Sequence, residues 1–160
     1  MPSDYYVKID GVEGESKAQG MSNNIELESF SFGASNPAQI GGGGLSAGKA
    51  SLSDFSFTSL LDSSSAPLLN NLFKGQHINS VVFTGRKSGS GATPVTFLTV
   101  TMTKCYVTGF STGGGSTGVP SQSVSLAFQE IKYEYKVQTD TGATQAKGAA
   151  TYDIAKVQQS

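Results

Sequence analysis

Three carboxylates lie close together near the start of the chain, in the stretch KIDGVEGES at residues 8–16. Asp10, Glu13 and Glu15 are residues that can bind metal ions, but their spacing does not match the oxygen-ligand series of a calcium-binding loop. Asp10-Gly11 directly follows an alternating apolar segment, which is typical of a turn after a strand. We therefore predict a structural turn here and no metal site.

A second candidate is GGLSAGKA at residues 43–50, which matches the pattern G-x-x-x-x-G-K. Ala50 stands where a phosphate-binding loop needs Ser or Thr for magnesium. The residues that follow alternate like a strand, whereas a phosphate-binding loop must open a helix. We predict instead a glycine-rich surface loop from Gly33 to Lys49, long enough that an interface role is the better functional interpretation.

The nucleophiles and bases of the chain are few. Cys105 and His77 are the only residues of their types, which excludes an internal disulfide, a multi-thiolate site and a histidine-rich metal site. Cys105 lies in a predicted strand, where a single cysteine is usually a small buried hydrophobe. His77 follows a predicted helix, where the helix dipole alone favours it.

Other charged residues form no recognisable catalytic set. Glu130, Glu134 and Asp153 are separated along the chain, so the sequence does not show whether they pair in space. Arg86-Lys87 precedes a Gly-Ser turn and is predicted to be the solvated end of a hairpin. We predict no catalytic residues, no cofactor and no enzymatic activity.

Alternating apolar residues predict strands at 5–9, 24–32, 52–57, 80–87, 95–110 and 124–137. In 24–32, 52–57 and 124–137 the apolar residues change face partway along, as near Glu28-Ser29. A strand changes face only where a residue is inserted or the chain twists sharply. Three such changes are typical of a strongly coiled sheet or barrel, so we predict a mainly β fold.

One short helix is predicted within SSSAPLLNNLFKGQ, residues 63–76. Ser64 or Ser65 is the expected N-cap, Pro67 lies in the first turn and Gly75 ends the helix. The spacing predicts a single apolar stripe, with the helix docked on the barrel or plugging one end of it; this stripe comprises Leu68, Leu69, Leu72 and Phe73.

The 160 residues suit one domain, residues 1–160. A charged fraction of 14% and a net charge of −1 give no basic footprint for nucleic acid. No apolar stretch approaches a membrane span, and the N-terminus lacks the pattern of a signal peptide. We therefore expect a soluble protein made in the cytosol, with neither nucleic acid nor a membrane as partner.

Several segments in order resemble the Hcp family of type VI secretion proteins, nearly from end to end. The segments that carry the resemblance are KIDGVEGES (8–16), IELESFSFGAS (25–35), GGGG…GK (41–49), DFSFT (54–58), LLDSSSAPLL (60–69), GQHI (75–78), GRKSG (85–89) and VSLAFQEIKYEYKVQ (124–138).

The resemblance implies a small closed antiparallel β-barrel of two curved sheets with one short α-helix, similar to phage tail-tube proteins. It implies homohexameric rings that stack into a tube and carry small effector proteins in the lumen. A contractile sheath on a baseplate would expel the tube, capped by a VgrG-type spike. The protein would be cytoplasmic before firing and extracellular afterwards, without a cleaved signal peptide.

Three sets of residues are then candidates for assembly. Ser29 and Ser31, opposite Phe30 and Phe32, are expected to line the lumen and contact cargo. Glu13 and Glu15 are expected at the subunit contact along the ring edge. The expected ring-stacking loop contains Ile40, Gly41, Gly42, Gly43, Gly44, Leu45, Gly48 and Lys49.

Two other functions remain open at this point. A tail-tube protein of a phage or of another contractile injection system would share the fold and the patterning. A monomeric β-barrel binding module would keep the alternation but would need a concave site. A lectin-like module would favour surface tryptophan, which this sequence lacks.

Overall fold

The computed structural model describes residues 3–37, 39–40, 45–46, 49–87, 94–138, 144–155 and 158–159, which form strands and one helix. The elements are β1 (Ser3–Ile9), β2 (Ile25–Leu27), β3 (Ser29–Ser31), β4 (Ala34–Ser35), β5 (Gln39–Ile40), β6 (Leu45–Ser46), β7 (Ser51–Leu52), β8 (Phe55–Leu60), α1 (Ser65–Lys74), β9 (Ile78–Lys87), β10 (Val95–Gly113), β11 (Ser121–Gln138), β12 (Thr144–Asp153) and β13 (Gln158–Gln159).

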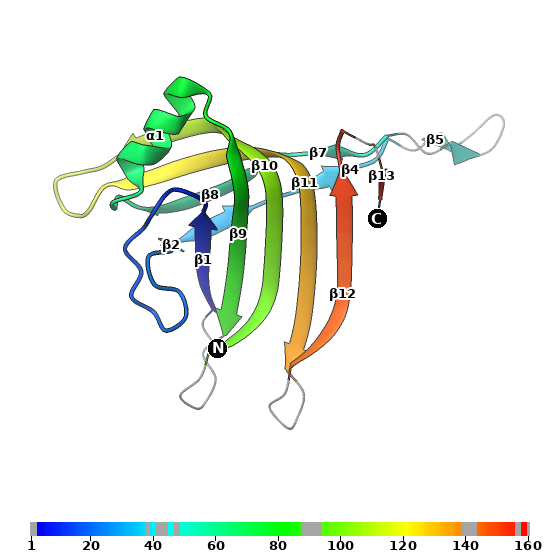
Figure 1. Ribbon diagram of the computed structural model, residues 1–160, viewed down its shortest axis with the longest axis horizontal. Helices are drawn as coiled ribbons and strands as arrows, with labels where there is room; N and C mark the ends of the chain where they lie inside the picture. Colours follow the sequence, from blue (N-terminus) through cyan, green and yellow to red (C-terminus); the bar gives the residue numbers. More distant parts are fainter. Residues whose placement is uncertain are drawn as a thin grey trace.

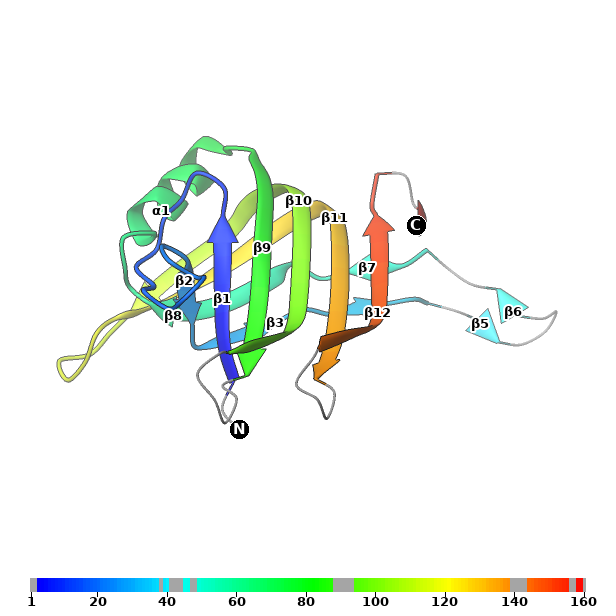
Figure 2. The same cartoon turned by 60° about the horizontal axis from the view of Figure 1, so that its bottom comes forward.

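The strands wrap into a nearly closed antiparallel barrel, as predicted (Figure 1). Hydrogen-bonded neighbours follow the order β13-β12-β11-β10-β9-β1-β2, and β8 connects β11 to β3. Only Glu28 separates β2 from β3, so one chain segment pairs with β1 at its start and with β8 at its end. Figure 2 shows the two curved layers, with β1, β9 and β10 on one side and β3 and β8 on the other.

The long strands bend where their buried residues change face. In β10 the buried side chains shift in phase between Met102 and Cys105, and Lys104 between them has a positive φ of 53°. In the neighbouring β11 the shift falls between Phe128 and Ile131, which confirms the predicted change of face. Because Cys105 pairs with Phe128, the two irregularities lie side by side and bend both strands together.

The two other predicted changes of face are also present. The segment 24–32 changes partner at Glu28, whose N–H donates to the Thr58 carbonyl at 2.8 Å. In the segment 52–57, residues 53–55 lie opposite residues 32–33, so one strand carries an extra residue. Each extra residue turns the following side chains to the other face, as the period of two requires.

A single hydrophobic core fills the barrel and joins both layers. Phe83 contributes from one layer and Phe55 from the other, with ring centroids 5.3 Å apart. Phe30 packs on Phe83 at 4.5 Å, and Tyr5 makes an edge contact with Phe30 at 5.0 Å. These aromatic contacts join β1, β3, β8 and β9, so the closure of the barrel depends on them.

Helix α1 has the predicted ends, but its apolar residues do not share one face. Ser64 is the N-cap, and Gly75 ends the helix in the left-handed conformation with φ 62°. Leu68 is fully buried, whereas Phe73 is 73% exposed. The single-stripe prediction is wrong. Each residue of an α-helix is rotated by about 100° from the one before it, so Leu69 and Phe73 point in a different direction from Leu68 and Leu72. The helix packs against β10 at one end of the barrel (Figure 1).

Candidate functional site

The acidic motif that follows β1 is a structural turn, as predicted. Gly11 has a φ of +82°, and the Val12 N–H donates to the Ile9 carbonyl at 3.0 Å. Gly14 packs directly on the backbone, since a Cβ there would lie 2.5 Å from the Asn24 carbonyl oxygen. The two glycines are therefore explained by geometry. The described residues contain no cluster of three or more His, Cys, Asp or Glu side chains able to hold a metal ion.

The turn also fastens the segment that precedes α1. The Ser63 N–H donates to Glu15 Oε2 at 2.8 Å, and Ser63 Oγ donates to the Glu13 carbonyl at 3.0 Å. The carboxylate of Glu15 is thus used inside the subunit. This contact joins parts of the chain almost fifty residues apart, which the sequence pattern alone did not reveal.

The described part of the predicted loop from Gly33 to Lys49 contains short paired strands. β4 pairs with β7, and further out β5 pairs with β6, where Ile40 lies opposite Leu45. Gly33 and Ser53 hold its base, because each backbone N–H donates to the other residue at 2.8 Å. We call residues 33–52 the arm. It extends away from the barrel in Figure 2.

The candidate stacking residues all fall within the arm. Ile40 and Leu45 belong to its outer strands, and Lys49 is exposed near its base. Strand β7 follows Lys49 where a phosphate-binding loop would continue as a helix, so the strand predicted after this segment is confirmed. The remaining glycines of the prediction, Gly41, Gly42, Gly43, Gly44 and Gly48, lie outside the described residues.

Ser29 and Ser31 belong to a wider surface of hydroxyl groups on β3, β8, β10 and β11. One row of paired residues runs from Ser29 through Thr58 and Ser123 to Ser111. The next row runs from Ser31 through Ser56 to Ser125. The oxygens of Ser29 and Thr58 are 2.6 Å apart, and those of Ser56 and Ser125 are 3.2 Å apart. We call these seven residues the hydroxyl face.

The structure separates this face from the threonines of β10. Val124 pairs with Phe57 on β8 and Val100 pairs with Phe83 on β9, and both valines are buried in the core. Because β8 and β9 lie in different layers of the barrel (Figure 2), the side chains that alternate with these two valines face outward on different sides. Thr99, Thr101 and Thr103 therefore do not belong to the hydroxyl face. The sequence showed which residues point away from the core, but strand pairing decides which of them share a surface.

Arg86 is buried, so the prediction of a solvated hairpin end is wrong for this residue. Its side chain is 7% exposed, and Nη1 donates to the Gln19 carbonyl at 2.6 Å. The guanidinium lies 4.8 Å above the centre of the Tyr6 ring. The loop between β1 and β2 covers this part of the barrel, which the sequence around Arg86 could not reveal. Lys87 is exposed as predicted.

The two candidate nucleophile and base residues do not form a catalytic pair. Cys105 is completely buried in the core, and this burial raises the pKa of its thiol to about 12. His77 is exposed after α1, with its ring centroid 5.2 Å from that of Tyr106. The prediction that Cys105 is a small buried hydrophobe is confirmed.

The three carboxylates of the late strands are divided between two environments. Glu130 on β11 lies opposite Asp153 on β12, so these two residues are neighbours. Glu134 forms a salt bridge with Lys132 at 3.3 Å. The structure therefore brings together Glu130 and Asp153, on neighbouring strands of the barrel, and leaves Glu134 apart from them.

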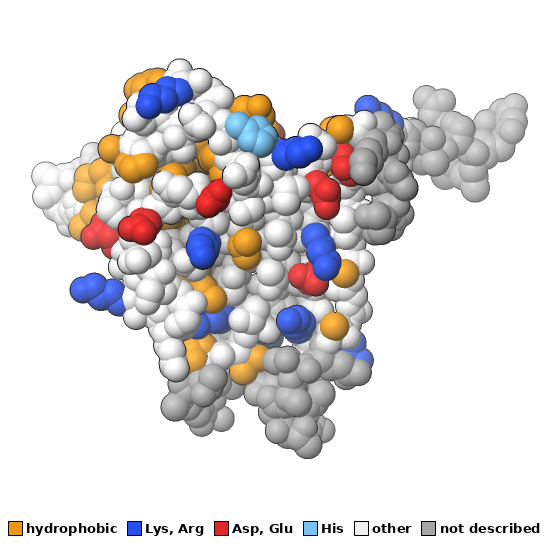
Figure 3. Space-filling model, viewed as in Figure 1, with side chains coloured by type: hydrophobic (Ala, Val, Ile, Leu, Met, Phe, Trp, Pro, Cys, Tyr) orange, Lys and Arg blue, Asp and Glu red, His pale blue; other side chains and the backbone are white. Residues whose placement is uncertain are grey.

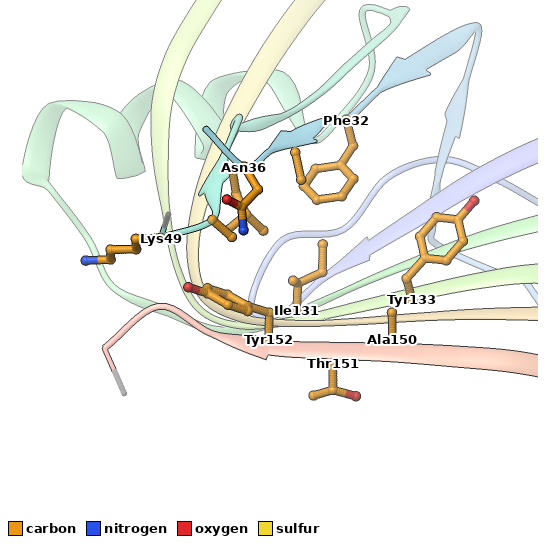
Figure 4. Close-up of a pocket in the computed structure, with 11 residues that line it drawn as sticks. Phe32, Asn36, Lys49, Ile131, Tyr133, Ala150, Thr151 and Tyr152 are labelled. Atoms are coloured by element: carbon orange, nitrogen blue, oxygen red, sulfur yellow. The ribbon is translucent and has the colours of Figure 1, made fainter. Parts of the chain in front are cut away.

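An apolar pocket lies between the base of the arm and the late strands (Figure 4). Phe32 and Leu52 come from the arm side, and Ile131, Tyr133 and Tyr152 come from β11 and β12. The cavity volume is about 470 Å³, and Lys49 is the one charged residue among the lining residues that the structure describes. Its two walls are far apart in the sequence, so no local pattern could have predicted it.

Comparison with known proteins gives consistent matches. A family model described as the type VI secretion system effector Hcp matches residues 6–135. Protein hcp1 of Pseudomonas aeruginosa is 34% identical over 145 residues, which cover 89% of this chain and 89% of that protein. No described helix is long and apolar enough to cross a membrane.

Solved structures show the same fold. A type six secretion system protein superimposes with a TM-score of 0.92 at 24% identity, covering 99% of this chain and 100% of the other. Hcp1 from Salmonella typhimurium superimposes with a TM-score of 0.80 at 28% identity, covering 100% of both chains.

Proposed function

The chain belongs to the Hcp family of type VI secretion proteins, and from this premise we propose that it is the subunit of a secreted inner tube. The observation that carries the proposal is the family match over most of the chain, together with a barrel that projects an arm from one end. In this role the protein acts through its shape and its contacts with other copies, and not as an enzyme.

The first level of assembly is a ring of six copies. A ring of this kind forms when one surface of a subunit binds a different surface of the next and the rotation closes. Glu13 is our candidate for a contact along the ring edge, since its side chain is exposed. Glu15 lies beside it and would act mainly by fixing the backbone of the turn through Ser63.

The second level is the stacking of rings, in which we assign the leading role to the arm. From Gly33 to Gly48 the sequence carries no charged residue, so the part of the arm beyond Lys49 can be buried against another ring without stripping water from an ion. The segment from Gly33 to Ile40 can reach at most about 25 Å when it is fully extended, at about 3.3 Å per residue. This length is enough to reach well beyond the subunit's own barrel.

The hydroxyl face is our candidate for the wall of the lumen. Its residues can exchange hydrogen bonds with water or with a passing polypeptide, and they carry neither charge nor large apolar surface. A wall of this composition would hold small effector proteins weakly. Ser31 is the first choice for cargo contact because it is exposed at the edge of the face.

The remaining partners follow from the proposed role. A contractile sheath on its baseplate would expel the tube, and a VgrG-type spike would cap it. The protein would then be cytoplasmic before firing and extracellular afterwards.

Native mass spectrometry of the purified protein tests directly whether it forms the proposed ring of six copies. We expect a dominant complex of six copies of the 16.6 kDa chain. Single copies at micromolar concentration would contradict the proposal and favour a monomeric binding module, with the apolar pocket beside Tyr133 as its site. A tail-tube protein of another contractile device would also give rings, so co-purification with type VI sheath components separates these two functions.

A further inference from the structure

We propose that the outward face of α1 is the acceptor surface for the arm of a subunit in the next ring. This inference rests on the proposed function and adds to it the receiving side of the stacking contact. The acceptor surface comprises Ala66, Pro67, Leu69, Asn70 and Phe73 of α1, together with the neighbouring Gly11.

Helix α1 has two apolar faces, and the barrel covers one of them. Leu68 and Leu72 pack into the core, whereas Ala66 and Phe73 are exposed and Leu69 is half-buried. The only charged residue in the helix is Lys74, at its last position. A helix that lies on a protein surface normally presents charged or polar side chains to water, so a helix that is apolar on both sides indicates a second partner. Figure 3 shows hydrophobic side chains on the surface around α1.

A groove runs along this face of the helix, with a volume of about 540 Å³. Of the described residues that line it, none carries a charge. Asn70 and Asn71 supply amide groups that can pair with exposed backbone groups of an incoming strand. The groove therefore combines apolar area with a few neutral hydrogen-bonding groups.

The arm matches this groove in its chemistry. Its outer strands pair Ile40 with Leu45, and the sequence around them consists of glycine and small neutral residues. Another surface pocket contains Glu15, Glu26, Glu28 and Asp62, and burying an uncharged ribbon there would desolvate carboxylates without providing them with partners. The apolar pocket beside Phe32 lies at the base of the arm itself.

The placement of the two surfaces supports a contact that repeats. The arm projects from one end of the longest axis of the molecule, and α1 lies toward the other end (Figures 1 and 2). A contact between unlike surfaces adds one copy after another, and it gives an open stack when the rotation between successive copies does not close into a ring. This is the symmetry that the growth of a tube by stacking requires.

Disulfide trapping tests the contact. In the double variant Leu45→Cys with Phe73→Cys, we expect mild oxidation to link subunits of adjacent rings into covalent ladders on a non-reducing gel. The matched control pairs Leu45→Cys with Val119→Cys, because Val119 is 62% exposed and lies on the hairpin between β10 and β11. The two single Phe73→Cys and Leu45→Cys variants define the background. The native Cys105 is completely buried and should not contribute.

We expect at least fivefold more linked product from the Leu45/Phe73 pair than from the control pair. Equal linking by the two pairs would overturn the inference, and six-copy rings in the same samples would show that the proposed function still stands. Absence of rings from the wild-type protein would instead overturn the proposed function, and this inference with it.

Electron microscopy of point variants is a second measurement. The Phe73→Asp substitution should shorten the tubes, whereas Val119→Asp should not. Tubes of normal length from Phe73→Asp would also contradict the inference.

Discussion

Arg86 fixes the long loop between β1 and β2 against the barrel. Its guanidinium reaches across to the Gln19 carbonyl and covers the Tyr6 ring, so one side chain joins β9, β1 and the loop. The Nε atom is buried and has no hydrogen-bond partner among the described residues. Burying Nε without a partner costs free energy, because this atom loses its hydrogen bond to water. The hydrogen bond of Nη1 and the contact of the guanidinium with the Tyr6 ring therefore have to outweigh that cost.

We predict that Arg86→Ala destabilises the protein by about 2–3 kcal/mol, through the loss of a charge-assisted hydrogen bond and of the cation–π contact. Equilibrium unfolding in urea measures the effect. Lys8→Ala, at an exposed position of the neighbouring strand, is the control and should change stability by less than about 0.5 kcal/mol. Equal effects of the two substitutions would show that Arg86 does not fix the loop.

Cys105 gives a prediction that depends on pH. Because burial raises its pKa from 9.0 to about 12, the native thiol keeps its proton at pH values where the unfolded thiol has lost it. The contribution of this group to stability is thus present below pH 9 and declines as the pH rises from 9 towards 12. Labelling with a thiol reagent at pH 8 should be complete in denaturant and negligible in the native protein; rapid native labelling would contradict the burial.

At the scale of elements, the arm and the barrel are built as separable parts. The pairs β4–β7 and β5–β6 form sheets of their own, apart from the nine-stranded barrel sheet. The aromatic contacts that close the barrel involve none of the residues of β5 and β6. Shortening the arm should accordingly leave the barrel folded.

We predict that deletion of residues 41–48 preserves six-copy rings and abolishes their stacking, because the outer part of the arm is lost. Native mass spectrometry reports the rings, and electron microscopy reports the stacks. Tubes of normal length from the deletion variant would refute the assignment of the arm. A variant that shortens the β10–β11 hairpin by removing residues 115–118 serves as the control for loop loss in general.

A prediction for the hydroxyl face concerns Ser31. A Ser31→Gln substitution should reduce the retention of small effectors several-fold, because each of the six copies would project a larger side chain into the lumen. Ring assembly should stay unchanged, since Ser31 is exposed in the single subunit. Co-purification of effector with the rings measures retention, and Lys8→Gln provides a matched exposed control. Unchanged retention would count against the placement of this face in the lumen.

The elements show how far local pattern determined this structure. The apolar phase changes near Glu28 and in 52–57 predicted irregularities that the structure contains, because a strand has only two faces. The helix ends at Ser64 and Gly75 were predicted from residue type; Gly75 ends the helix in the left-handed conformation, whereas the Ser64 side chain makes no capping hydrogen bond. The arm was predicted as a loop because its strands are only two residues long and the sequence between them is rich in glycine, which carries little β-strand signal.

The candidate surfaces were less predictable than the elements. Ser29 and Ser31 were identified, but their partners Thr58, Ser56 and Ser125 join them only through strand pairing. The burial of Arg86 depends on a loop more than sixty residues away in the chain. Contacts of this kind arise from tertiary structure, which residue types and spacing do not encode locally.

At the scale of the whole molecule, the subunit is strongly asymmetric. The arm projects at one end, and the uncharged outward face of α1 lies toward the other (Figure 2). The hydroxyl face occupies one side of the barrel between them. A subunit with different surfaces at its two ends is suited to polar, open-ended assembly, and this agrees with its membership of the Hcp family.

Electron microscopy of the purified wild-type protein shows whether this chain is a tube subunit. We predict uniform rings with six-fold symmetry and an open centre, which stack into tubes at high concentration. Featureless single particles of the size of one 16.6 kDa chain would contradict it.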